Sequence, residues 1–205
     1  MNARKIPDII IGRLPVYLRA LQRMSDLGLK TTSSQELGEQ VGISAAQIRK
    51  DVSQFGEFGK QGTGYSIEYL IEKLREILKV NRIWDVVVVG AGDMGHALAN
   101  YQAFHNRGFR VVAIFDNDKS KVGAPIGKFS VEDAENLAER IRELGVKIVM
   151  LTVPASAAQS VADLAIQAGV KAILNYAPVS LNVPGNVKVQ YIDPSAHLQR
   201  MTYYL

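Results

Sequence analysis

The sequence contains no cysteine, which excludes disulfide bonds, thiolate metal sites and cysteine nucleophiles. Its three histidines, His96, His105 and His197, are dispersed along the chain, so we expect no metal site. No run reaches the roughly 18 apolar residues of a membrane span, and the first residues show neither a signal-peptide nor a transit-peptide pattern. We therefore expect a cytoplasmic protein without a membrane partner.

Charge and hydrophobic pattern divide the 205 residues into two parts near residue 80. With 47% hydrophobic and 21% charged residues, the composition is that of a globular protein. Residues 1–80 hold 12 Lys and Arg against 9 Asp and Glu, whereas residues 81–205 hold 12 against 11. The net charge of +4 therefore lies mostly in the first part, which hints at an anionic partner.

The first part is predicted to hold a helix-turn-helix. Apolar residues at three- and four-residue steps predict a helix over 14–27, with Pro15 in its first turn and Gly28 as its stop. A short helix capped by one of the hydroxyl residues 32–34 follows, and a glycine-containing turn joins it to a helix over 45–55. Arg and Lys can bond guanine or phosphate, and Gln can pair with adenine, so the outward face of this last helix suits a major groove. The residues that we assign to DNA on this helix are Ser44, Gln47, Arg49, Lys50 and Gln54.

Three glycines around a Lys-Gln pair predict a hairpin over residues 58–65. Its tip, Lys60 and Gln61, would rest against phosphate, which completes a winged helix-turn-helix. The alternative is a small helical domain with a solvated basic face, which the position of the hairpin disfavours. A helix capped by Ser66 then runs to about Lys79.

The second part opens with a dinucleotide-binding pattern. A β-branched strand over 85–89 leads into a glycine turn and then a helix over 96–106. The first glycine permits a sharp turn, the second lets backbone N–H groups approach a pyrophosphate, and the third allows close packing of the helix. The residues of this turn are Gly90, Ala91, Gly92, Asp93, Met94 and Gly95.

Asp116 ends the next predicted strand, over 110–115. An acid at this place can accept bonds from both hydroxyls of an adenosine ribose and would repel a 2′-phosphate, so NAD(H) is favoured over NADP(H). A turn or cap role for Asp116 is the structural alternative.

Further alternation predicts a parallel, doubly wound sheet: helix 131–144, strand 147–153, helix 155–168 and strand 172–175. The ends of the two later strands should meet at the carboxyl edge beside the nucleotide. The residues that we assign to that edge are Thr152, Val153, Pro154, Asn175, Tyr176 and Ala177. Asp193 and Pro194 then read as the N-cap and first residue of a last helix, over 195–204.

This arrangement resembles the Rex family of redox-sensing transcriptional repressors over nearly the whole chain. An Arg-Lys-Asp motif and a Phe-Gly-x-Phe-Gly motif ahead of a Rossmann fingerprint form a specific combination. The residues that carry the resemblance are 12–19, 47–51, 55–59, the glycine turn continued through Asn100 and Tyr101, and Asp193.

The resemblance implies a homodimer that binds a palindromic operator when NADH is scarce and releases it when NADH binds, so that it responds to the NADH/NAD⁺ ratio. It divides the chain into a winged-helix domain (1–80), a Rossmann domain (81–192) and a helix exchanged between subunits (193–205).

The resemblance also implies roles for single residues. Arg49 and Lys50 would contact DNA, and Tyr101 would lie near the nicotinamide. Asp193 of one subunit would bond Tyr101 or Arg13 of the other and change partner as NADH enters. From the residues alone, simpler roles stay open: Asp193 could cap its helix, Tyr101 could fill a helix–sheet interface, and Arg13 could be solvated.

Two other functions stay open from the residues. An NAD-dependent dehydrogenase needs an acid or base near the nicotinamide, and the dispersed histidines are poor candidates. About 125 residues of Rossmann domain also leave little chain for a catalytic domain. Alternatively, the ligand could be coenzyme A or another nucleotide, although Asp116 favours a free ribose diol.

Overall fold

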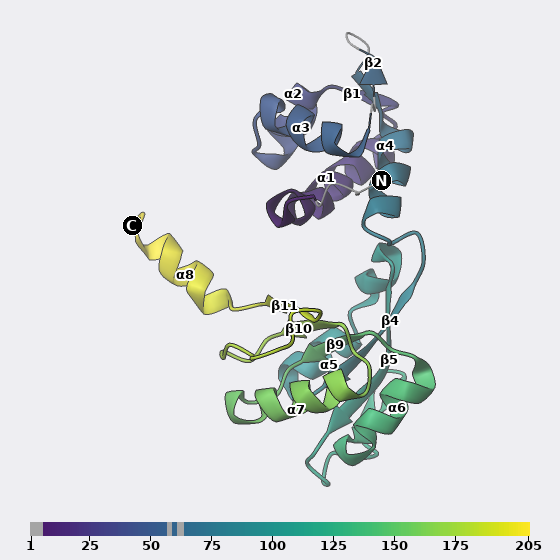
Figure 1. The fold of residues 1–205 in the computed structure, drawn as a ribbon, viewed down its shortest axis with the longest axis vertical. Helices are drawn as coiled ribbons and strands as arrows, with labels where there is room; N and C mark the ends of the chain where they lie inside the picture. Colours follow the sequence, from purple (N-terminus) through teal and green to yellow (C-terminus); the bar gives the residue numbers. More distant parts are fainter. Residues whose placement is uncertain (1–5, 57–58, 61–63) are drawn as a thin grey trace. The chain divides into compact units, whose positions relative to one another are not determined.

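The computed structural model describes residues 6–56, 59–60 and 64–205. The chain falls into two compact units, Met1–Arg82 and Ile83–Leu205, and the expected change of pattern at residue 80 lies next to this boundary (Figure 1). Each unit has its own hydrophobic core.

The first unit begins with α1 (Asp8–Asp26). The prediction for its start was wrong: Pro15 lies inside the helix and not in its first turn, because Ile10 extends the buried stripe toward the N-terminus. The predicted end is confirmed. Gly28 has a left-handed φ of 82°, and the N–H of Leu29 donates to the carbonyl oxygen of Met24.

The predicted helix-turn-helix is confirmed as α2 (Ser34–Val41) and α3 (Ala45–Val52). Ser33 caps α2 by accepting a hydrogen bond from the N–H of Glu36, whose carboxylate accepts one from the N–H of Ser33. Gly42 between the helices has a left-handed φ of 68°. α3 is shorter than predicted, because residues Ser53–Phe55 form a 3₁₀ turn.

The wing is a small antiparallel sheet. Its strands are β1 (Thr31–Thr32), β2 (Gly59–Lys60) and β3 (Gly64–Ser66), in the order β1-β3-β2. The pairing of β2 with β3 confirms the predicted hairpin, whereas β1 was not predicted. Of the predicted tip, Lys60 lies in β2 without a described side chain, and Gln61 lies outside the described residues. Ser66 caps α4 (Ile67–Ile77), as expected.

The second unit contains a six-stranded sheet in which all neighbours are parallel. Its order is β11-β10-β9-β4-β5-β8, which is the order of a doubly wound Rossmann sheet. The strands are β4 (Trp84–Val89), β5 (Phe109–Asp116), β8 (Glu132–Asp133), β9 (Ile148–Leu151), β10 (Ala172–Asn175) and β11 (Lys188–Tyr191).

Helices cover both faces of this sheet (Figure 1). On one face, α6 (Leu137–Leu144) and α7 (Ala155–Gln167) pack over Val87, Val89 and Val149. On the other, the core around Val86 and Val88 includes residues of three elements. These elements are α5 (Asp93–Ala99), the 3₁₀ helix η2 (Gln102–Arg107) and the hairpin of β6 (Pro125–Ile126) and β7 (Phe129–Ser130).

Two predicted helices of this unit were wrong in extent. The helix predicted over 96–106 begins at Asp93 as α5, ends at Ala99 and gives way to η2, since the amide of Asn100 donates to the carbonyl oxygen of His96 and closes α5. The helix predicted over 131–144 begins instead with β8 and a 3₁₀ turn (Ala134–Asn136). The edge strand β11 was not predicted.

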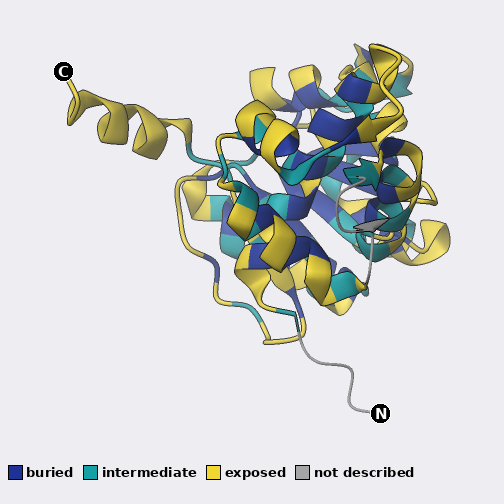
Figure 2. Cartoon of the chain, turned by 90° about the horizontal axis from the view of Figure 1, so that it is seen from above, coloured by how far each residue is buried: buried dark blue, intermediate teal, exposed yellow. Residues whose placement is uncertain are grey.

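The last element, α8 (Pro194–Thr202), follows β11. Asp193 is its N-cap and Pro194 its first residue, as predicted. None of its residues, all of which are described, is buried, and it projects from the sheet as an exposed ribbon (Figure 2). Among the described residues, we find no helix with the length and apolar character needed to cross a bilayer.

Candidate nucleotide-binding site and DNA-binding surface

The predicted glycine turn joins the end of β4 to the start of α5. Gly90 has a φ of 106°, and a Cβ atom there would lie 2.6 Å from the carbonyl oxygen of Thr152. A Cβ atom at Gly95 would overlap the carbonyl oxygen of Gly90. Both positions therefore require glycine, the first for its φ and the second for the close packing of α5 on the turn.

Gly92 differs from these two glycines because it borders open space. Apart from Gly92 itself and the residues adjacent to it in the chain, no atom of the described residues lies within 4 Å of a Cβ atom built there. Gly92 is the N-cap of α5, and no described side chain caps this helix end. The N–H groups of Asp93, Met94 and Gly95 have no acceptor within the helix, so this end fits the pyrophosphate of a dinucleotide.

Asp116, at the end of β5, is only 7% exposed. Its Oδ2 accepts hydrogen bonds from the N–H of Ala91 at 2.7 Å and from Nζ of Lys121 at 3.3 Å, and its Oδ1 accepts one from the N–H of Asp118 at 2.8 Å. Burial raises the pKa of Asp116, but these hydrogen bonds outweigh it and hold the pKa below its ordinary value. Asp116 is thus an ionised acceptor with lone pairs left for ribose hydroxyls. Ala91 donates to Asp116, so its N–H is not free for a phosphate.

The glycine turn and Thr152 lie at the point between β4 and β9 where the order of the strands along the chain reverses. β4 and β9 are neighbours, and the chain continues from β4 to β5 on one side and from β9 to β10 on the other. Ligands of such sheets bind at this point, outside the carboxyl ends of the strands. Oγ1 of Thr152 lies 2.8 Å from the carbonyl oxygen of Gly90 and 3.0 Å from that of Val89, so it braces the turn. Val153 and Pro154 follow Thr152 in the chain, and Val153 is half-buried whereas Pro154 is exposed.

Asn175, which the sequence assigned to the nucleotide, is fully buried and bonds its own loop instead. Its Nδ2 lies 3.1 Å and 2.9 Å from the carbonyl oxygens of Ala177 and Val179, and its Oδ1 accepts from the N–H of Ala177. Asn175 therefore shapes the edge of the site without facing it. Ala177 is buried as well, whereas Tyr176 is half-buried, and burial raises its pKa.

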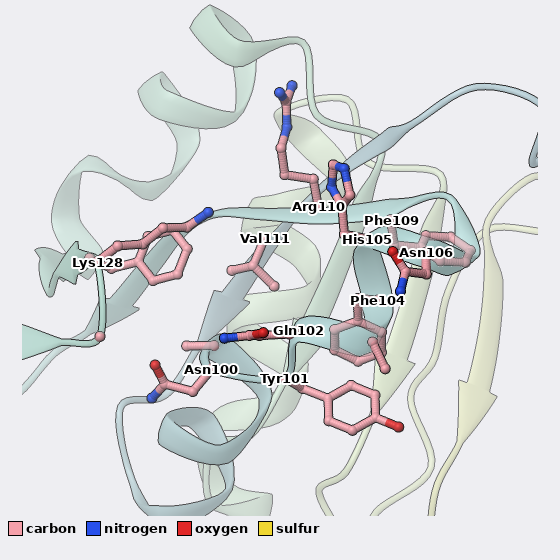
Figure 3. Close-up of a pocket in the computed structure, with 14 residues that line it drawn as sticks. Asn100, Tyr101, Gln102, Phe104, His105, Asn106, Phe109, Arg110, Val111 and Lys128 are labelled. Atoms are coloured by element: carbon pink, nitrogen blue, oxygen red, sulfur yellow. The ribbon is translucent and has the colours of Figure 1, made fainter.

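Tyr101 lies beyond the C-terminal end of α5, whereas the glycine turn lies at its N-terminal end. It is 47% exposed, and its ring packs edge-on against Phe104 with centroids 4.9 Å apart. Both line a pocket of about 750 Å³ with Phe109, the first residue of β5, and Lys128 (Figure 3). Within one chain, Tyr101 is thus separated from the glycine turn by the length of α5, about 10 Å for seven residues.

The outward face of α3 carries the predicted basic residues. Arg49 and Lys50 are exposed, as are Ser44 and Gln54. Ser44 is also the N-cap of α3, accepting from the N–H of Gln47. Nη1 of Arg49 donates to Oγ of Ser34 at 2.9 Å, which links α3 to α2. These side chains form a polar and basic surface that can contact phosphates and base edges.

Sequence reasoning missed the functional group behind this surface, the carboxylate of Asp51. Asp51 lies on α3 and is fully buried. It accepts hydrogen bonds from Nε and Nη2 of Arg13 at 2.6 and 2.8 Å, from the hydroxyl of Tyr17 at 2.7 Å and from Nε2 of Gln47 at 2.6 Å. Burial raises the pKa of Asp51, but the bonds from Arg13, Tyr17 and Gln47 hold it below its ordinary value.

Two expectations change with this cluster. Gln47, expected on the outward face of α3, is half-buried and bonded to Asp51, and its contact with DNA stays a prediction. Arg13, for which a solvated role stayed open, is half-buried and donates two hydrogen bonds to this carboxylate. Its contact with Asp193 of a partner subunit stays a prediction. The signal was the spacing of Gln47 and Asp51, four residues apart on one helix face.

Asp193 has a local partner in the single chain. Its Oδ1 accepts hydrogen bonds from the N–H and the hydroxyl of Ser195, and these bonds lower its pKa. Among the described residues, no hydrogen bond joins Asp193 to Tyr101.

Two known protein families match the two units. The family described as "Putative DNA-binding protein N-terminus" matches residues 5–53, and the family described as "CoA binding domain" matches residues 81–179.

Similar proteins match over nearly the whole chain. The chain is 50% identical to "Redox-sensing transcriptional repressor Rex" of Chloroflexus aggregans over 97% of its own length and 94% of that protein. It is 44% identical to the protein of the same name of Desulforamulus reducens, over 100% and 98%.

Solved structures of one protein, called RSP and described as a Rex-family repressor, are similar along the chain. The complex of RSP with β-NAD⁺ and operator DNA has a TM-score of 0.93 and 36% identity, over 98% of this chain and 92% of that one. The complex of RSP with β-NADH has a TM-score of 0.89 and 35% identity, over 97% and 93%.

Proposed function

Because the chain belongs to the Rex family of redox-sensing transcriptional repressors, we propose that it binds operator DNA through α3 and the wing and leaves it when NADH binds. The observation that carries this proposal is that one chain combines a basic helix-turn-helix with a glycine turn next to the buried carboxylate of Asp116. A regulator of this kind would work in the cytoplasm and would need no catalytic residue, which disfavours the dehydrogenase alternative.

For the nucleotide, we propose NADH and NAD⁺ as the sensed ligands. The N-terminal end of α5, from Gly92 to Gly95, would hold the pyrophosphate, and Asp116 would accept bonds from the ribose hydroxyls. NADH and NAD⁺ differ in the charge of the nicotinamide ring, which is the difference that a redox sensor has to read. The buried, ionised state of Asp116 and the open space at Gly92 support this assignment.

For DNA, we propose that Ser44, Gln47, Arg49, Lys50 and Gln54 contact the major groove and its phosphates, together with Lys60 and Gln61. Gln47 is half-buried and the other four residues of the α3 side are exposed, and the two basic residues give this face a positive charge.

The active form is proposed to be a homodimer on a palindromic operator. Two recognition helices must lie about 34 Å apart to meet successive major grooves, so a change in dimer geometry would release DNA. The C-terminal segment 193–205, which contains the exposed helix α8, is proposed to pack on the partner subunit, where Asp193 would reach Tyr101 of the partner subunit. Support comes from the exposure of its apolar residues: Leu198 and Met201 are each 62% exposed. Arg13 of the partner subunit is the other proposed partner of Asp193 in this switch, because its two bonds to Asp51 leave further guanidinium N–H groups for a second carboxylate.

Coenzyme A is a second candidate ligand, favoured by the family that matches residues 81–179. Its ribose carries a phosphate in place of one free hydroxyl, which Asp116 would repel. Calorimetry with NADH, NAD⁺, NADPH and coenzyme A separates these ligands: we expect NADH to bind with the highest affinity.

The proposed function is tested by fluorescence anisotropy on a palindromic duplex selected by the full-length chain. We expect binding in buffer and with NAD⁺, and release on addition of NADH. A chain that holds the duplex equally in NADH and NAD⁺ would not be a redox sensor.

A further inference from the structure

The glycine turn carries one charged side chain, that of Asp93, the first residue of α5. Asp93 is exposed and directly follows Gly92, at the helix end where we propose the pyrophosphate. An acid in the first turn stabilises a helix as long as no other anion is bound at that end. Once a pyrophosphate binds there, the carboxylate of Asp93 would lie close to charges of its own sign.

No described neighbour offsets the charge of Asp93. In the part of the chain that the structure describes, its carboxylate accepts no hydrogen bond and forms no ion pair. Asp116, the acid proposed to bind the ribose, differs in both respects. It is 7% exposed, and it accepts hydrogen bonds from two backbone N–H groups and from Lys121. A nucleotide at the glycine turn would therefore experience the charge of Asp93 more fully than that of Asp116.

The two proposed ligands differ by one unit of charge. Both carry two phosphate charges, and the pyridinium ring of NAD⁺ cancels one of them, whereas the ring of NADH is neutral. A fixed negative charge in the site repels both nucleotides, and it repels NADH more strongly because NADH has the larger net negative charge. A carboxylate can thus lower the selectivity for the reduced form without contacting the nicotinamide ring.

We propose that Asp93 sets the NADH/NAD⁺ ratio to which the chain responds, because it lowers the affinity for NADH more than the affinity for NAD⁺. This inference rests on the proposed function, since it requires both nucleotides to bind at the glycine turn. The Debye length is about 8 Å at physiological salt, and a single ribose separates the nicotinamide from the pyrophosphate. Salt therefore screens the ring from Asp93 only in part.

Asp93→Asn tests the proposal in the full-length chain, because it removes the charge and keeps the size of the side chain. Calorimetry measures the affinities for NADH and NAD⁺. We expect the NADH affinity to rise about fivefold to tenfold and the NAD⁺ affinity about twofold to threefold, so that the selectivity for NADH rises about threefold.

Two further variants are controls. Asp93→Glu keeps the charge and should bind both nucleotides nearly as the native chain does. Glu139→Gln removes another exposed acid from the first turn of a helix, α6, which does not begin at the glycine turn, and it should leave both affinities unchanged.

Salt separates the charge of Asp93 from its shape. Screening weakens repulsion between exposed charges, so the NADH affinities of the native chain and of Asp93→Asn should converge as the salt concentration rises from about 0.05 M to about 0.5 M. A difference that does not depend on salt overturns the proposal. A lower NADH affinity in Asp93→Asn, or a native affinity that rises with Mg²⁺ while that of the variant does not, also overturns it, because Asp93 would then bind a ribose hydroxyl or a cation.

Operator release gives the functional measurement. Anisotropy on the selected duplex, with NAD⁺ saturating and NADH increasing, gives the NADH/NAD⁺ ratio at half release. We expect this ratio to be about threefold lower for Asp93→Asn, with an unchanged operator affinity in the absence of nucleotide, which also shows that the variant is folded. An unchanged ratio overturns this inference alone, whereas a native chain that binds neither nucleotide overturns the proposed function as well.

Discussion

At the scale of single residues, the ammonium group of Lys121 lies beside the carboxylate of Asp116 in the proposed ribose site. Nζ of Lys121 lies 3.3 Å from Oδ2 of Asp116 and offsets part of the charge that repels a 2′-phosphate. We expect Lys121→Ala to lower the affinity for NADPH about threefold more than the affinity for NADH, measured by calorimetry. Lys119→Ala is the matched control, because that ammonium pairs with Asp133 and Glu135. If the ratio of NADPH affinity to NADH affinity is the same in the Lys121→Ala and Lys119→Ala variants, Lys121 does not offset the charge of Asp116.

The buried carboxylate of Asp51 makes a second prediction at this scale. Removing one partner of a buried ion pair costs about 3–5 kcal/mol, so Asp51→Ala should lower the free energy of unfolding by about that amount. Tyr17→Phe, which removes one hydrogen bond, should cost about 1–2 kcal/mol. Urea denaturation at neutral pH measures both. An Asp51→Ala variant with an unchanged free energy of unfolding would show that this cluster does not stabilise the fold.

The sign of the pH dependence follows from the lowered pKa of Asp51. Its stabilising contribution is complete above the unfolded-state pKa of about 3.9 and is lost as the pH falls through the folded-state value. The native chain should therefore lose more stability on acidification than Asp51→Ala does.

Single residues could be placed from the sequence where a motif has one known local geometry. The glycine turn and Asp116 follow each other in strand order, so their proximity could be read from the pattern. The pairing of Asp51 with Arg13 could not be predicted from the sequence, because Arg13 lies 38 residues away and only the packing of α1 on α3 brings the two together.

At the scale of elements, α3 is expected to bind DNA without affecting the nucleotide. Arg49→Ala with Lys50→Ala should weaken operator binding by about two orders of magnitude and leave NADH affinity unchanged, because these side chains lie in the other compact unit. Anisotropy and calorimetry on one preparation give the two affinities. Lys73→Ala on α4 is the control, and parallel loss of both affinities would contradict the division of roles.

Elements that depend on tertiary context escaped prediction. The four-residue spacing of Leu137 and Ile141 is helical, but Val131 packs in one core of the sheet and these two in the opposite core, so the chain must cross the sheet edge before the helix begins. The alternation Lys-Val-Gln-Tyr of β11 carries one inward apolar residue, Val189, which is too little signal for a strand.

At the scale of the whole molecule, α8 is expected to hold the dimer together. Leu198→Glu with Met201→Glu places two charges on its apolar side, where a partner would have to bury them. Sedimentation velocity should show a monomer, with operator affinity reduced. Gln199→Glu on the same exposed helix should remain a dimer, and a dimeric double variant would exclude α8 from the interface.

The central claim is that nucleotide and operator bind the same molecule with opposed preferences, and coupled binding is reciprocal. The direct measurement is the operator Kd with and without saturating NADH, together with the NADH Kd with and without operator. We expect both to rise by the same factor, about tenfold to a hundredfold, with Asp116→Ala needing far more NADH for the same release. An operator Kd that does not change across the NADH titration would contradict the account.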